Sequence, residues 1–182
     1  MTSGRNPPPL NNIMTSKKLL SYTIAGILFT SITGTLAHFA YEWSQENFLV
    51  GLFTPVSEST WEHMKLLFFP MLLYGIFACI RLMPDYPCIS YAYPLGMLLG
   101  TFAIPILFYT YTGILGTNYT PIDILIFYIS VILGFVMIYK KTLSCKKTNI
   151  KAREKNLLPW LAILLLTACF IIFTIFPPGI IM

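Results

Sequence analysis

The chain has 182 residues, of which 56% are hydrophobic and only 10% are charged. A soluble domain carries roughly a quarter charged residues, so this chain has too few charges to cover a water-soluble globule. Its net charge of +5 does not indicate a nucleic-acid partner, because the basic residues gather in segments that flank apolar runs. The composition therefore excludes a soluble nucleic-acid binder and predicts an integral membrane protein.

Five apolar segments have the length of about 20 residues that a helix needs to cross the hydrocarbon core of a bilayer. Each should be helical, because the bilayer core offers its backbone groups no other partner. We expect the spans at residues 19–40, 61–80, 89–112, 121–139 and 158–176. The sequence thus predicts an all-α, polytopic five-helix transmembrane bundle, forming a single domain over residues 19–182.

Two features modify this simple picture. Residues 1–18 are polar and contain three consecutive prolines, so we expect a disordered cytoplasmic tail, within which Met14 offers an alternative start. Pro70, Pro94 and Pro105 interrupt the second and third spans. We expect them to kink these helices and to leave carbonyl groups free for other partners.

The distribution of lysine and arginine predicts the orientation. Eleven of the twelve basic residues lie on one side of the predicted spans, and seven of them fall in the loop of residues 140–157. Since positive charge marks the cytoplasmic side, the N-terminus should be inside and the C-terminus outside. The loop itself serves chiefly as a topology determinant, the alternative being a dock for anionic lipid or a cytoplasmic partner.

Most groups capable of acid–base or metal chemistry fall on the predicted outer side. Ionisable side chains at membrane depth are costly and commonly mark functional sites. The loop between the first two spans should make them antiparallel neighbours, which would gather these side chains in one pocket. The candidate ligand-binding residues are His38, Glu42, Glu58, Trp61, Glu62, His63 and Lys65.

The residue at which the second helix begins determines which of these side chains lie on the same helix face. If the helix begins after Pro55, then Glu58, Glu62 and Lys65 share one face and His63 points elsewhere. A capping box at Ser59 and Glu62 would instead give a later start. In either case Glu62 and Lys65 are close enough to pair.

A metal site is a weaker hypothesis. His38, His63 and Glu62 carry suitable ligand atoms, and zinc is the metal that this ligand set suits. Their spacing matches no known catalytic motif, however, because Glu62 and His63 are adjacent rather than spaced along a helix face. The four cysteines, Cys79, Cys88, Cys145 and Cys169, show no metal-ligand spacing and are expected to be free thiols.

One segment resembles a known family. The stretch from His38 to Ser44, followed by Gly51-Leu-Phe-Thr-Pro-Val-Ser-Glu-Ser-Thr-Trp-Glu-His-Met-Lys65, is similar to the hallmark region of an uncharacterised family. Its members are small multi-pass membrane proteins of Gram-positive bacteria. The resemblance implies a bacterial plasma-membrane location but no activity, and it implies that the motif positions are Glu58, Trp61, Glu62, His63 and Lys65.

Three functions remain open from the sequence. The first is binding or transport of a small polar solute in the outer pocket, which would require a homo-oligomer or a partner subunit. The Gly96-x-x-x-Gly100 pair would offer a close-packing surface. The second is a membrane-embedded, metal-dependent enzyme acting on a lipid at the outer leaflet. The third is a non-catalytic accessory or immunity protein. The absence of a recognisable nucleophile–base pair favours the first.

Overall fold

The computed structural model describes residues 10–148 and 157–177, and this part of the chain is all-helical. Its helices are α1 (Leu10–Trp43), α2 (Phe48–Gly51), α3 (Thr60–Leu82), α4 (Ile89–Leu115), α5 (Thr120–Thr148) and α6 (Leu157–Ile175). All except the four-residue α2 are long and apolar enough to cross a membrane. The prediction of five long apolar helices is therefore confirmed, whereas α2 was not predicted.

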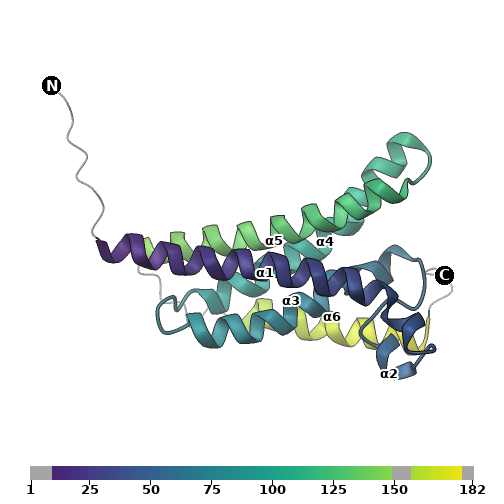
Figure 1. Cartoon of the computed structure of the whole chain (residues 1–182), viewed down its shortest axis with the longest axis horizontal. Coiled ribbons are helices and arrows are strands. Elements are labelled where there is room, and N and C mark those ends of the chain that lie inside the picture. Colours follow the sequence, from purple (N-terminus) through teal and green to yellow (C-terminus); the bar gives the residue numbers. More distant parts are fainter. Residues whose placement is uncertain (1–9, 149–156, 178–182) are drawn as a thin grey trace.

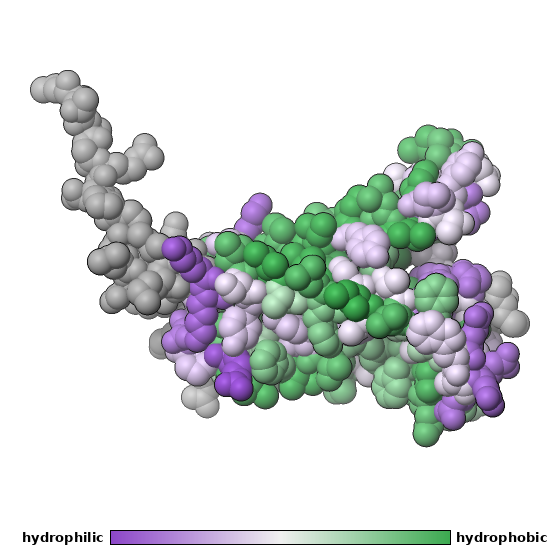
Figure 2. Space-filling view, viewed as in Figure 1, coloured by the Kyte–Doolittle hydropathy of each residue, from purple (hydrophilic) through white to green (hydrophobic). Residues whose placement is uncertain are grey.

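The long helices form one elongated bundle (Figure 1). Helices α4 and α5 make the most extensive contact, α1 packs against α3 and α5, and α3 packs against α4. Near their connecting turn, α4 and α5 leave the bundle as a hairpin that stands apart, and a notch separates it from the rest of the surface (Figure 2). We call the end that carries α2 and the last turn of α6 the α2 end.

Two helices, α1 and α5, extend far beyond the predicted spans, whereas the other long helices exceed them by at most three residues. Helix α1 begins at Leu10, within the range expected to be disordered, and α5 continues to Thr148, into the basic segment of residues 140–157. Hydropathy marks only the part of a helix that is apolar, whereas backbone hydrogen bonding continues until a residue breaks it. Residues 1–9 of the expected tail and residues 149–156 of the basic segment lie outside the described residues.

At Pro94 the carbonyl group that the proline frees is used by another helix, as expected. Pro94 cannot donate to the carbonyl of Ser90 one turn earlier. The indole Nε1 of Trp160 on α6 donates to that oxygen instead, over 2.8 Å. Pro70 likewise leaves the carbonyl of Leu66 without its helical donor. This oxygen faces Gly34 of α1, where an added Cβ would lie 2.5 Å from it.

Glycines allow α4 and α5 to approach closely. A Cβ built at Gly96 would lie 2.5 Å from the carbonyl oxygen of Gly134, and one built at Gly100 would lie 2.9 Å from that of Ser130. The Gly96-x-x-x-Gly100 surface is therefore occupied within the chain. It offers no support for an oligomer, although the sequence suggested that use.

The expectation that the cysteines are free thiols is wrong at Cys88. Cys88, which precedes α4, is disulfide-bonded, whereas Cys79 and Cys169 are free. The sequence spacing gave no signal for this bond, because disulfide partners are chosen by proximity in the fold rather than by separation along the chain.

We expect Gly96→Ala to destabilise the protein by about 1–3 kcal/mol, the usual cost of overpacking, because the new methyl group would meet the α5 backbone. Gly113→Ala is the matched control on the same helix, since nothing lies within 4 Å of its Cβ position. It should be neutral or slightly stabilising. Thermal unfolding in detergent compares the two variants, and equal effects would contradict the proposed α4–α5 contact.

Candidate metal centre at the α2 end

A buried ion pair lies at the start of α3. The Nζ atom of Lys65 is 2.7 Å from Oε2 of Glu62, and the two side chains are only 0% and 5% exposed. The predicted pairing of these residues is thus confirmed. Because the pair is closed to solvent, each charge must find all its partners within the protein.

Lys65 reaches three separate parts of the chain. Besides Glu62, its ammonium donates to the carbonyl oxygen of Gly51 over 3.2 Å and to the hydroxyl of Thr174 over 2.5 Å. The carbonyl of Thr54 lies 3.5 Å away. An ammonium group has three hydrogens to donate. Lys65 therefore connects α3 to the end of α2 and to α6. Its three N–H groups already have acceptors within the protein.

The carboxylate of Glu62 fixes the loop that precedes α3. Its Oε2 accepts the backbone N–H of Val56 over 2.9 Å. Ser59 is the N-cap of α3 and accepts the N–H of Glu62 over 3.3 Å. The later of the two helix starts is therefore correct, and the early start after Pro55 is wrong. Glu58 consequently precedes the helix instead of sharing a face with Glu62.

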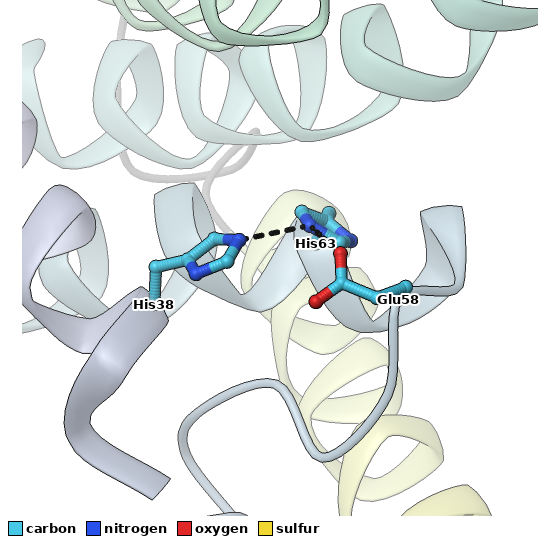
Figure 3. A group of neighbouring side chains, drawn as sticks. All are labelled: His38, Glu58 and His63. Carbon is cyan, nitrogen blue, oxygen red and sulfur yellow. Dashed lines mark hydrogen bonds and ion pairs between the residues drawn. The ribbon is translucent and has the colours of Figure 1, made fainter. Parts of the chain in front are cut away.

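Two histidines meet beside this loop (Figure 3). Nε2 of His38 on α1 lies 3.3 Å from Nε2 of His63 on α3. The carboxylate of Glu58 lies 3.4 Å from the same His63 nitrogen. One ligand atom from each residue falls within 4.8 Å of the other two. We call these three residues the His–Glu–His triad.

A backbone carbonyl orients the central histidine. Nδ1 of His63 lies 2.9 Å from the carbonyl oxygen of Ser59. Since a carbonyl can only accept, Nδ1 carries a proton in the bonded ring, and in the neutral form of that ring Nε2 presents its lone pair to the triad. The same arrangement, with the outer nitrogen bound to a carbonyl, is usual for metal-binding histidines.

The triad is accessible, in contrast to the ion pair. The side chain of Glu58 is 86% exposed and that of His63 is 28% exposed. A ligand could therefore reach the triad from outside the bundle without any rearrangement of Glu62 and Lys65.

The seven candidate residues thus occupy different environments. His38, Glu58 and His63 form the triad, and Glu62 and Lys65 form the buried pair. Glu42 is exposed beyond the triad on α1. Trp61 packs its ring against Phe170 and Phe173 of α6. The structure also places Glu58, rather than Glu62, beside the two histidines. Thr174 was missed, because nothing in the sequence links it to a lysine 109 residues away.

The ion pair predicts strong coupling between its partners. Lys65→Met should cost about 3–5 kcal/mol, since it leaves a buried carboxylate without its cation. Combining it with Glu62→Gln should cost clearly less than the sum of the single changes. The exposed pair Lys18–Asp85, with each side chain 44% exposed, is the control and should couple by about 0–1 kcal/mol. Thermal unfolding in detergent measures both double-mutant cycles. If the effects of the Glu62 and Lys65 changes simply added, the two residues would not form a coupled ion pair.

Comparison with known proteins places the chain in a family without adding an activity. No curated protein matches the chain, and no solved structure matches it. A family of unknown function (DUF6512) matches residues 10–182, far beyond the segment from His38 to Lys65 on which the sequence resemblance depended. The chain therefore belongs to this family of unknown function.

Proposed function

We propose that the protein binds a divalent metal ion of the zinc class on His38, Glu58 and His63. Imidazole nitrogens and carboxylate oxygens are zinc ligands, at about 2.0–2.2 Å from the metal. Two such atoms in a tetrahedral shell are separated by about 3.3 Å. The two distances to Nε2 of His63, 3.3 Å and 3.4 Å, match this separation, and ligand atoms of all three residues lie within 4.8 Å of one another; this gathering of ligand atoms carries the proposal.

The number of ligands indicates what the metal would do. Structural zinc sites normally have four protein ligands, whereas catalytic sites have three and leave a position for water or substrate. The triad supplies three, and the exposure of Glu58 leaves room for a fourth ligand from outside. A metal held in this way can polarise a bound oxygen or lower the pKa of a bound water. The geometry therefore favours a metal-dependent membrane protein.

The buried Glu62–Lys65 pair favours the metal site over the solute-binding pocket that the sequence suggested. Binding a polar solute between Glu62 and Lys65 would require breaking contacts that both residues already make inside the protein. Their role in the proposal is to hold the loop that carries Glu58. That loop must stay in place for the carboxylate to face His63.

The surface supports a membrane setting. A green apolar belt separates hydrophilic residues at the two ends (Figure 2). We place the chain in the bacterial plasma membrane, with the basic residues 140–157 in the cytoplasm and the α2 end outside. A disulfide at Cys88 is unusual for a cytoplasmic surface, which makes a direct test of orientation informative.

Purified full-length protein should bind about one zinc ion per chain, and His63→Ala or His38→Ala should weaken the affinity by about 100-fold or more. Zinc at 100 times its dissociation constant should stabilise the fold by about 2.7 kcal/mol. Metal analysis and thermal unfolding with and without a chelator measure these effects. Glu46→Gln is the control, because it removes an exposed carboxylate of the same end outside the triad. Loss of zinc binding in the control, or retention in both histidine variants, would contradict the proposal.

The orientation predicts which cysteines an impermeant thiol reagent can reach. Thr117→Cys, in the exposed turn between α4 and α5, should be labelled on intact cells. Lys141→Cys, which is exposed near the opposite end of α5, should be labelled only after the cells are opened. The unsubstituted chain measures the background labelling of the cysteines already present. The reverse pattern would place the triad in the cytoplasm.

A further inference from the structure

A lipid-facing stripe on α1 passes beside the triad. Its members recur at helical spacing, are each at least 44% exposed, and comprise Leu28, Ile32, Leu36, Phe39 and Trp43. The ring of Phe39 contacts that of His38, with 5.2 Å between centroids. Trp43 follows His38 by five residues, or about 7–8 Å along the helix. Since tryptophan favours the membrane interface, His38 lies just below head-group level.

The segment around α2 also indicates that this end of the protein lies at the level of the lipid head groups. Phe48, Leu49 and Phe53 are 59%, 67% and 50% exposed, although they lie within six residues of the polar segment 44–47. Exposed aromatic and aliphatic side chains next to polar ones are typical of segments that lie in the interface plane. The α2 end therefore meets lipid head groups rather than open water, and a lipid could reach the triad from the side.

The charges near the triad select among head groups. Of the described lysines and arginines, only Lys65 lies at the α2 end, and it is buried and paired. Glu42 and Glu46 are exposed there. Glu42 follows His38 by one helical turn and so lies on the same side of α1, about 6 Å away. A metal on the triad would thus present one accessible positive centre with a carboxylate beside it.

We propose that the ligand of this site is the head group of a zwitterionic phospholipid, an inference that rests on the metal site proposed above. A phosphate oxygen takes the open position on the metal. The ammonium group lies against Glu42, and the acyl chains run along the exposed stripe of α1. An anionic lipid without an ammonium group gains the metal contact but meets the Glu42 carboxylate unpaired.

The test measures lipid binding to zinc-loaded, full-length protein in detergent by native mass spectrometry. The probes are phosphatidylethanolamine and phosphatidylglycerol with identical acyl chains. We expect the protein to prefer phosphatidylethanolamine by about tenfold, the factor that one charge-assisted contact supplies. Glu42→Gln should remove most of this preference, whereas Glu46→Gln should keep it. Free phosphorylethanolamine and inorganic phosphate should compete poorly, because neither carries acyl chains.

The outcomes separate this inference from the metal proposal. If zinc binds but phosphatidylglycerol binds equally well, or if Glu42→Gln leaves the preference unchanged, the head-group inference is wrong and the metal site stands. Effective competition by inorganic phosphate would show a phosphate site without lipid selectivity, and it too would overturn the inference. If zinc does not bind at all, both proposals fail. Removing zinc with a chelator should abolish the preference in the unsubstituted chain.

Discussion

The arrangement of the α2 end depends on the need to satisfy a buried positive charge. An unpaired ammonium in an apolar bundle would be very costly, so Lys65 must be surrounded by acceptors. The chain supplies them from three places, through Glu62, the carbonyl of Gly51 and the hydroxyl of Thr174. The pair adds little net stability by itself, because desolvation offsets much of the attraction. Its main consequence is that α2, the loop before α3 and the end of α6 have one arrangement relative to one another.

The triad depends on that arrangement for one of its three members. The histidines lie on long helices, α1 and α3, which pack against each other and approach closely where Gly34 faces the carbonyl of Leu66. Glu58 lies in the loop, and its position follows from the hydrogen bond between Glu62 and Val56 two residues earlier. A rigid helix pair and a pinned loop together give the fixed ligand geometry that a metal site requires.

The sequence predicted the five long apolar helices, because hydropathy constrains them strongly. It also predicted the Glu62–Lys65 pair, since i, i+3 spacing on a helix is local geometry. It also placed His38 and His63 in one pocket and named both as possible metal ligands, but their direct contact depends on the rotation of two helices about their axes, which the sequence does not show. Glu58 was predicted as a candidate ligand-binding residue, but Glu62 took its place in the metal hypothesis, because the sequence did not show which carboxylate lies beside the histidines. Helix α2 has only four residues, too few for any periodicity, although Asn47 does cap it.

The central claim is that a metal ion is held by two imidazoles and one carboxylate. X-ray absorption spectroscopy of the zinc-loaded, full-length protein tests it most directly, because it reports the ligand atoms and their distances from the metal. We predict a shell of nitrogen and oxygen atoms at about 2.0–2.2 Å with the scattering pattern of two imidazole rings. A sulfur shell at about 2.3 Å, or a shell without imidazole, would place the metal elsewhere and contradict the account.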